Sequence, residues 1–244
     1  MVNSLGNRLL NGLFPQCCAL CGFASDSHLP LCAGCKADLA LNTHACLRCA
    51  IPLPPMAGPD AEARTCGTCL QQPPAFARAI APWIYEEHLA HLIQRWKYRS
   101  ERWLTPLLSS LLAESGASPH NVDLLVPVPM HWRRRWHRGY NQSELLAHQL
   151  LRNSPGFAHA RVDTALTRRN RATRAQSGMR AGERRANLRG AFTVMRPCDN
   201  LRIAIVDDVL TTGATAATIA TEIAAAGAAR IELWCLARTP APGL

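Results

Sequence analysis

Four pairs of cysteines with the spacing C-x-x-C lie between positions 18 and 69 of this 244-residue chain. Two intervening residues allow a tight turn to bring both thiolates to one tetrahedral ion, and Zn²⁺ binds sulfur at about 2.3 Å. Four pairs supply eight ligands, which is enough for two all-cysteine sites. The predicted ligands are Cys18, Cys21, Cys32, Cys35, Cys46, Cys49, Cys66 and Cys69.

Two other uses of cysteine fit this pattern less well. A disulfide framework is typical of secreted proteins, and the stretch Met1 to Gln16 is too polar for the core of a signal peptide. A thioredoxin-like redox motif accounts for one C-x-x-C pair and not for four. We therefore predict two structural Zn²⁺ sites, since four sulfur ligands leave no open position for chemistry. Successive pairs are expected to combine, which leaves Cys17 as a spare thiol.

The length of the chain allows one full α/β domain and a small appendage. The cysteine-rich part has about 70 residues with few large apolar side chains, so bound metal must supply much of its folding energy. No run of about 18 apolar residues is present, so we expect a cytoplasmic protein with no transmembrane segment. The predicted division is an N-terminal amphipathic segment at 1–16, a double zinc ribbon at 17–72 and a larger domain at 75–244.

Apolar periodicity after residue 75 alternates between strand and helix patterns. This alternation predicts an α/β fold with a doubly wound, mostly parallel sheet. The polar, arginine-rich stretch 167–189 is expected to be a long loop with one helical turn near 182–187. The expected strands are 76–85, 122–128, 162–166, 202–207 and 230–236, and the expected helices are 86–98, 103–113, 141–152 and 214–226.

Positive charge is concentrated in one segment of the chain. The net charge is +10, and the segment from His131 to Gly190 holds fourteen arginines against three acids, which alone gives 14 − 3 = +11. Such a segment indicates an anionic partner, whether a phosphorylated small molecule, pyrophosphate or nucleic acid, or else a solvated surface. Trp132 and Trp136 would stack on bases or, as is commoner for aromatic residues, lie in the core. Lys97 would contact phosphate or simply lie on the surface.

The stretch from Ile203 to Thr215 has the order strand, two acids, Thr-Gly-x-Thr and helix. Asp207 and Asp208 stand at the expected carboxyl end of a strand, where open α/β sheets bind ligands. Small hydroxyl and glycine residues let backbone N–H groups approach a phosphate, and the following helix start adds its positive dipole end. The stretch therefore predicts a site for a phosphorylated ribose, with the acids facing the ribose hydroxyls and a Mg²⁺ ion.

This stretch resembles the phosphoribosyl-pyrophosphate loop of the phosphoribosyltransferases. The resemblance extends over nearly the whole chain to the ComF branch, which joins a double zinc ribbon to such a domain and is linked to natural competence. It implies a phosphoribosyltransferase-type sheet at 75–244. The matching segments are the four cysteine pairs, Asp123-Leu-Leu-Val-Pro-Val-Pro129, Arg138-Gly-Tyr-Asn-Gln-Ser-Glu144, Thr173-Arg-Ala-Gln176, Arg184-Arg-Ala-Asn187 and Ala237-Arg-Thr239.

The resemblance also implies a role for each matching position. Asp207 and Asp208, the candidate catalytic residues, would hold the ribose hydroxyls and Mg²⁺. Stretch 167–189 would be the flexible loop that closes over the reaction centre. Residues implied to bind the 5′-phosphate are Thr211, Thr212, Gly213, Ala214 and Thr215, and those implied to contact pyrophosphate are Val128, Pro129, His131 and Arg138.

One departure from the family pattern leaves the activity open. Many purine transferases have an acid just before the Thr-Gly pair, and here that position is Thr211. Three hypotheses follow: a phosphoribosyltransferase with an unknown acceptor, a single-stranded-DNA-binding protein, and a module that senses phosphoribosyl pyrophosphate and binds other competence proteins. Our prediction is a phosphoribosyltransferase-like competence protein that binds phosphoribosyl pyrophosphate, whether or not it catalyses transfer.

Overall fold

The computed structural model describes residues 16–25, 27–55, 64–114, 119, 121–171, 188 and 190–241. Nearly all of the expected N-terminal amphipathic segment therefore lies outside the described residues. The same holds for most of the expected loop 167–189, including its segments 173–176 and 184–187. No helix within the described ranges is long and apolar enough to cross a membrane.

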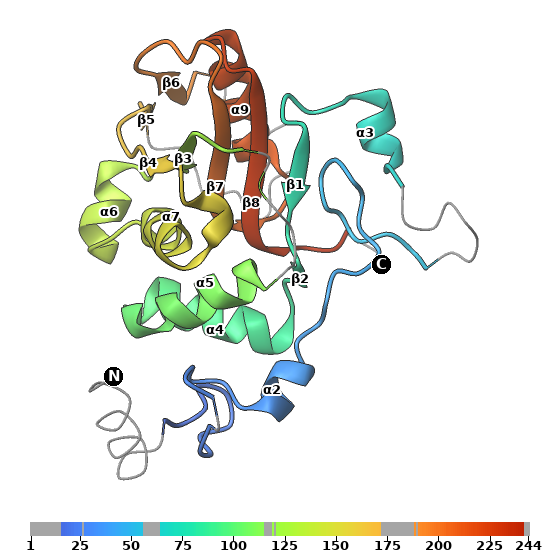
Figure 1. Cartoon of the computed structure of the whole chain (residues 1–244), viewed down its shortest axis with the longest axis vertical. Coiled ribbons are helices and arrows are strands. Elements are labelled where there is room, and N and C mark those ends of the chain that lie inside the picture. The colour runs from blue at the N-terminus through green and yellow to red at the C-terminus, as the bar shows by residue number, and fades with distance from the viewer. Residues whose placement is uncertain are drawn as a thin grey trace.

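A parallel sheet forms the centre of the larger domain (Figure 1). Its strand order is β1-β8-β7-β3-β4, and β2 also pairs with β8. Every pairing in this sheet is parallel. The strands are β1 (Arg78–Ile80), β2 (Trp83–Ile84), β3 (Leu124–Pro127), β4 (Arg161–Val162), β7 (Arg202–Leu210) and β8 (Arg230–Arg238).

The centre of the sheet is a topological switch point. From β3 the chain passes outward to β4, whereas from the neighbouring β7 it passes outward in the opposite direction to β8. Ligands of open α/β sheets bind at the carboxyl ends of two such strands. Pro127 of β3 is in register with Val206 of β7, so the residues that follow each strand lie at the same edge of the sheet.

Helices cover both faces of the sheet. Alternate residues of β7 point to opposite faces: Ala204 and Val206 belong to one core cluster, and Ile203 and Ile205 to the other. The first cluster packs against α4 (Glu87–Tyr98), α5 (Thr105–Ala113) and α7 (Gln142–Asn153), and the second against α9 (Ala214–Ala225). The predicted fold class, a mostly parallel α/β sheet preceded by two cysteine clusters, is confirmed.

Three of the expected strands are shorter than predicted, and the one expected at 122–128 covers only Leu124–Pro127. The strand expected at 76–85 is divided into β1 and β2, because Pro82 has no N–H to continue the ladder. The strand expected at 162–166 ends at Val162, because the Asp163 carboxylate accepts the N–H groups of Ala165 and Leu166 and turns the chain.

The two ends of the expected loop 167–189 have regular structure. The chain enters the loop along β5 (Thr167–Arg169) and leaves it along β6 (Phe192–Val194). These strands pair antiparallel in a separate two-stranded sheet. The predicted loop is therefore wrong at its first residues, because Thr167 to Arg169 form a strand.

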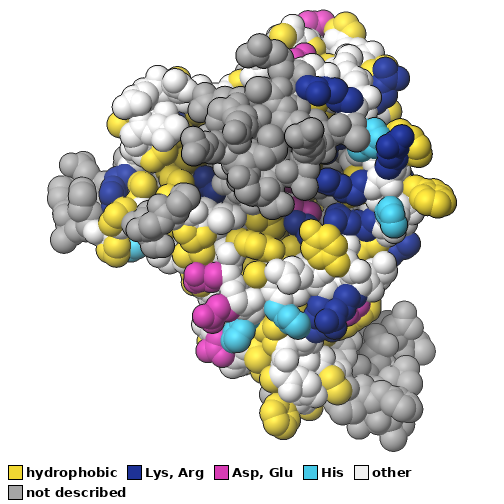
Figure 2. All heavy atoms as spheres, turned by 180° about the vertical axis from the view of Figure 1, so that it is seen from behind, with side chains coloured by type: hydrophobic (Ala, Val, Ile, Leu, Met, Phe, Trp, Pro, Cys, Tyr) yellow, Lys and Arg dark blue, Asp and Glu magenta, His cyan; other side chains and the backbone are white. Residues whose placement is uncertain are grey.

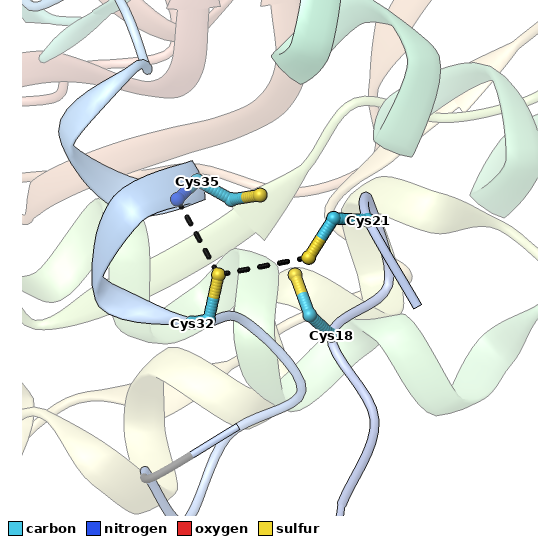
Figure 3. Close-up of side chains that lie close together, drawn as sticks. All are labelled: Cys18, Cys21, Cys32 and Cys35. Atoms are coloured by element: carbon cyan, nitrogen blue, oxygen red, sulfur yellow. Dashed lines mark hydrogen bonds between the residues drawn. The ribbon is translucent and has the colours of Figure 1, made fainter. Parts of the chain in front are cut away.

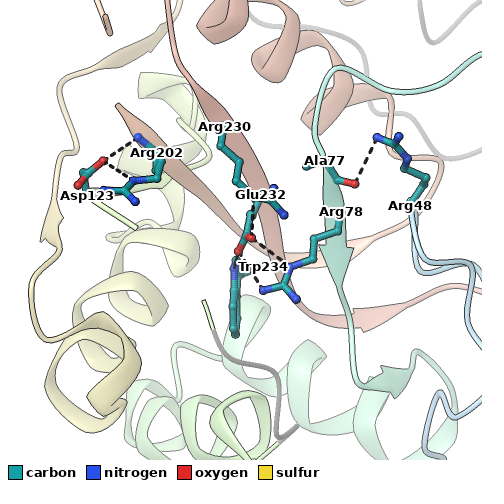
Figure 4. Close-up of polar contacts among 8 residues, drawn as sticks. All are labelled: Arg48, Ala77, Arg78, Asp123, Arg202, Arg230, Glu232 and Trp234. Carbon is teal, nitrogen blue, oxygen red and sulfur yellow. Dashed lines mark hydrogen bonds and ion pairs between the residues drawn. The ribbon is translucent and has the colours of Figure 1, made fainter. Parts of the chain in front are cut away.

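A buried glutamate on β8 is neutralised by its neighbours on the sheet (Figure 4). Glu232 accepts hydrogen bonds from Arg78 of β1, Arg230 of its own strand and the indole N–H of Trp234. Just before β1, which is an edge strand of the sheet, the carbonyl oxygen of Ala77 accepts a hydrogen bond at 3.4 Å from Arg48 of the cysteine-rich part. The second cysteine unit therefore contacts the start of β1.

The first cysteine unit shares the core of the larger domain. Leu31 and Leu39 belong to the same buried cluster as Trp96 of α4, and Arg95 of α4 donates to the carbonyl oxygen of Ala19. Two short helices complete the cysteine-rich part, α2 (Ala33–Ala37) and α3 (Gly67–Gln71).

Candidate functional site

The eight predicted zinc ligands form two groups of four. Cys18, Cys21, Cys32 and Cys35 make one group (Figure 3) and Cys46, Cys49, Cys66 and Cys69 the other. Within each group all sulfur atoms lie within 4.8 Å of one another. The Sγ atoms of Cys21 and Cys32 are 3.7 Å apart, as are those of Cys49 and Cys66. A tetrahedral site with Zn–S bonds of about 2.3 Å requires about 3.8 Å between sulfurs, so both groups fit Zn²⁺, and the expected pairing of successive C-x-x-C motifs is confirmed.

Backbone N–H groups donate hydrogen bonds to some of these thiols. The N–H of Cys66 donates to the sulfur of Cys46 at 3.2 Å, and the N–H of Cys35 to that of Cys32 at 3.5 Å. Burial alone would raise the pKa of Cys18 and Cys46, but backbone N–H donors lower the two values to about 6 and about 7. Burial and neighbouring thiols instead raise the pKa of Cys35, Cys49 and Cys69, and because zinc binds the thiolate form, metal binding to these thiols would release protons.

The cysteines outside the four pairs occupy two kinds of environment. Cys198 and Cys235 are fully buried, as expected for cysteines that pack as small apolar groups. Cys17 is exposed and belongs to neither group of four.

A cleft of about 320 Å³ opens at the carboxyl ends of β3 and β7. Seven of the residues predicted to bind the phosphorylated ribose line it, and four do not. The lining residues are Val128, Pro129, Arg138, Asp207, Asp208, Thr211 and Thr215, whereas His131, Thr212, Gly213 and Ala214 are not among them.

The acid pair lies within a strand and not just after one. β7 was expected to end at Asp207, but it continues to Leu210 beside β8. One Asp207 oxygen accepts the Ser143 hydroxyl at 3.0 Å and the N–H of Asp208 at 2.9 Å. These contacts fix the orientation of the Asp207 carboxylate toward α7.

Lys97, at the end of α4, contributes a cation to the cleft. Its Nζ lies 2.7 Å from an oxygen of Asp208, and both side chains are 15% exposed. Burial by itself lowers the pKa of Lys97, but the charges of Asp208 and Asp207 outweigh it and the pKa is raised. The surface-lysine alternative is therefore wrong, and no spacing in the sequence connects position 97 with position 208.

The two acids of the pair have different electrostatic environments. Burial, together with the neighbouring charge of Asp208, raises the pKa of Asp207 to about 7. The nearby charge of Lys97 and the hydrogen bonds from Asp208 N–H and Ser143 oppose this shift without cancelling it. Near neutral pH the cleft therefore contains one carboxylate paired with a lysine and one that titrates.

The Thr211–Thr215 loop turns the chain from β7 into α9. Gly213 precedes the helix with φ of 75°, a left-handed conformation that favours glycine. The first N–H groups of a helix have no partner within it, and α9 begins at Ala214 beside the cleft residue Thr215. The loop therefore places a helix N-terminus next to the acid pair.

Arg238, at the end of β8, donates hydrogen bonds to the backbone at the start of this loop. It is 5% exposed, and its Nη1 donates to the carbonyl oxygens of Leu210 at 2.9 Å, Thr239 at 2.7 Å and Thr211. Its Nε donates to the carbonyl oxygen of Cys49, a predicted zinc ligand, at 3.2 Å. The sequence did not predict this role, although an arginine directly after the apolar run 233–237 was a usable signal.

The basic segment 131–139 forms a helix beside the cleft. This helix, α6 (Trp132–Arg138), is capped by the His131 side chain and ends at Gly139 with φ of 79°. Trp132 is 66% exposed and Trp136 is 84% exposed, so the commoner expectation that these aromatics lie in the core is wrong. Figure 2 shows arginine and lysine side chains gathered with histidine and hydrophobic side chains on one side of the molecule.

Comparisons with known proteins agree with this architecture. A family model described as a double zinc ribbon domain matches residues 9–70. DNA utilization protein YhgH of Escherichia coli K12 is 34% identical over 232 residues, covering 92% of this chain and 98% of the relative. Competence protein F of Haemophilus influenzae is 33% identical over 219 residues, covering 85% and 90%.

One solved structure has a weaker likeness to this chain. This structure, of the allosteric regulatory enzyme of purine biosynthesis, shares 20% identity with the chain at a TM-score of 0.36, over 54% of this chain and 25% of that one.

Fold and site together define a double zinc-ribbon protein joined to a parallel α/β domain, with a cleft that contains an acid pair at the switch point of its sheet. The chain belongs to the ComF family, with Competence protein F and DNA utilization protein YhgH among its relatives.

Proposed function

We propose that this protein binds phosphoribosyl pyrophosphate with Mg²⁺ in the cleft between β3 and β7, and that it acts in the uptake and use of DNA. One observation carries the first part. Asp207 and Asp208 line the same cleft as two features suited to phosphate, which are the Thr211–Thr215 loop with the start of α9 and the arginines of α6.

Each part of this ligand has matching chemistry in the cleft. The helix N-terminus and the hydroxyl of Thr215 suit the 5′-phosphate. Arg134 and Arg138 also line the cleft, and guanidinium groups match the geometry of pyrophosphate oxygens. Carboxylate oxygens suit both ribose hydroxyls and Mg²⁺, and a cleft of about 320 Å³ is within the range of small-molecule sites.

The process is supported by the relatives. Two family members that align over at least 85% of this chain are named for competence and for DNA utilization. A shared role in handling DNA is the simplest account of both names.

Calorimetric titration of the zinc-loaded protein with phosphoribosyl pyrophosphate and Mg²⁺ tests the ligand. We expect saturable binding that requires Mg²⁺ and is weakened at least about tenfold in the double variant Asp207→Asn/Asp208→Asn, because hydrogen bonds to charged groups contribute about 1.5–3 kcal/mol. Asp163→Asn, a carboxylate outside the cleft that pairs with Arg196, is the matched control. Absence of binding to the parent protein, or equal binding by the double variant, would contradict the proposal.

A second candidate function, binding of single-stranded DNA, rests on the surface of α6. Two exposed tryptophans stand there on either side of three consecutive arginines, and stacking of bases on aromatic rings beside a basic groove is how many proteins hold single strands. Fluorescence anisotropy with a labelled oligonucleotide should show affinity that falls as salt rises. Trp136→Ala should weaken binding, whereas Trp103→Ala, which removes a half-exposed tryptophan between α4 and α5, should not. Equal affinity of both variants would count against this candidate.

A further inference from the structure

The buried side chain of Arg238 joins the second cysteine cluster to the candidate phosphate loop. At one end its Nε donates to the carbonyl oxygen of Cys49. At the other end its Nη1 donates to the carbonyl oxygens of Leu210 and Thr211. Thr211 itself lines the cleft, so one guanidinium connects a metal-ligating residue with the first residue of the loop.

We propose that metal occupancy of the Cys46–Cys69 cluster controls the conformation of the Thr211–Thr215 loop through Arg238, and thereby the affinity of the cleft for its phosphorylated ligand. This inference rests on the proposed function for the identity of the ligand. Arg238 acts as a positioning residue, because its contacts are with backbone carbonyls behind the loop and it is not among the residues that line the cleft.

The connection is rigid because Arg238 is buried. A guanidinium at 5% exposure must keep its acceptors, since an unpaired buried donor is costly. The planar fork of arginine fixes the directions of its N–H groups relative to one another. Movement of the Cys49 carbonyl therefore has to be accommodated at Leu210 and Thr211 or leave part of the charge without a partner.

The backbone around Cys49 depends on the metal cluster for its shape. Ala50, the next residue, has φ of 54°, a left-handed conformation that costs energy for a residue with a side chain. Its N–H donates to the carbonyl oxygen of Cys46 at 2.8 Å, which closes the turn between the two ligands. Its own carbonyl oxygen accepts from Asn42 at 2.8 Å. Loss of the ion removes the bonds that hold Cys46 and Cys49 together and releases this turn.

The first cluster has different attachments and therefore serves as a control. Its unit contacts α4 through the bond from Arg95 to Ala19 and contacts the end of α5 through the pair Lys36–Glu114. Neither of these contacts involves a residue of the Thr211–Thr215 loop. Its metal should therefore affect stability without a direct effect on the loop.

Three variants of the full chain separate these effects. Cys66→Ser/Cys69→Ser removes two ligands of the second cluster and leaves Cys49 in place, and Cys32→Ser/Cys35→Ser is the matched change in the first. Arg238→Lys keeps both clusters and the positive charge but loses the fork. For each protein we would measure zinc content, thermal unfolding, affinity for phosphoribosyl pyrophosphate with Mg²⁺, and hydrogen exchange of the amides of 211–215, with the amides of β3 as an internal reference.

We expect Cys66→Ser/Cys69→Ser and Arg238→Lys to speed exchange in 211–215 relative to β3 and to weaken ligand binding about fivefold or more, the usual lower range of coupling between two sites. Cys32→Ser/Cys35→Ser should leave affinity within about twofold, as for independent sites. Unchanged affinity and exchange in both second-cluster and Arg238 variants, or equal losses in the first-cluster variant, would overturn the coupling while leaving the proposed function intact.

If the parent protein does not bind phosphoribosyl pyrophosphate, the proposed function fails by itself. The coupling is then judged from exchange alone: faster exchange of 211–215 in Arg238→Lys, with full zinc content, supports it, and unchanged exchange refutes it. Arg238→Lys also decides the matter if a double cysteine variant does not fold, since it leaves all eight ligands in place.

Discussion

Replacing Asp207 by asparagine should stabilise the ligand-free protein, and the stabilisation should grow with pH. The pKa of Asp207 is raised from its ordinary value of 3.8 to about 7, first by burial and then by the charge of Asp208. Between these two values the folded protein holds a proton that the unfolded chain has lost, so stability falls as pH rises, and the loss is complete above about pH 7. Asparagine has no proton to lose, and it can still accept from the Ser143 hydroxyl and the Asp208 N–H.

The size of the effect follows from the pKa shift. Each unit corresponds to about 1.4 kcal/mol, so the advantage of Asp207→Asn should grow by about 2 kcal/mol between pH 5.5 and pH 7 and then level off. Urea unfolding without added Mg²⁺ measures it, followed by the fluorescence of the tryptophans. Trp96 and Trp234 are fully buried and report the core. Because the comparison is made at each pH, any effect of pH on the zinc sites is common to both proteins.

Asp163→Asn is the control of opposite sign. Burial would raise the pKa of Asp163, but the Arg196 ion pair and the N–H groups of Ala165 and Leu166 lower it below its ordinary range. Its stabilising contribution is therefore fully present above the ordinary value of 3.8 and is lost only as pH falls below it. Asp163→Asn should destabilise by a constant amount from pH 5.5 to 8. A constant difference for Asp207→Asn, or one that shrinks as pH rises, would refute the electrostatic account of the cleft.

Further predictions concern the loop, the sheet and the metal. Gly213→Ala should cost about 1 kcal/mol in urea unfolding, because φ of 75° is unfavourable for alanine; the nearest atom to the new Cβ is a Leu210 methyl at 3.6 Å, so no clash adds to that cost. Glu232→Gln should destabilise by about 2 kcal/mol, since it leaves the cations of Arg78 and Arg230 without their shared carboxylate; an unchanged unfolding midpoint would show that solvent already screens them. Chelation of zinc should lower the thermal midpoint and should release two ions per chain, and a different stoichiometry by metal analysis would contradict the two-cluster assignment.

The features that could be predicted from sequence are those encoded within short segments. Each C-x-x-C pair carries its own turn, and the order of strand, acids, small residues and helix around Asp207 is contained in about fifteen residues. The contacts of Lys97 with Asp208 and of Arg238 with the loop were not predicted, because these side chains reach the site from α4 and from the end of β8. Their partners lie 111 and 28 positions away along the chain. Only the packing of helix on sheet and the pairing of β7 with β8 bring them together.

Lys97 and Arg238 explain how the acid pair and the loop are held in the absence of ligand. Lys97 pairs with Asp208, and with the pKa of Asp207 near 7 the pair carries little net charge at neutral pH. Mg²⁺ bound by both carboxylates would have to displace the Asp207 proton and weaken the Lys97 ion pair, so ligand affinity should be coupled to proton release. Arg238 meanwhile satisfies three carbonyls behind the loop and fixes the loop's starting residue independently of this charge balance. The electrostatic response of the cleft therefore depends on Lys97 and Asp207, whereas the shape of its loop depends on Arg238 and the second cysteine cluster.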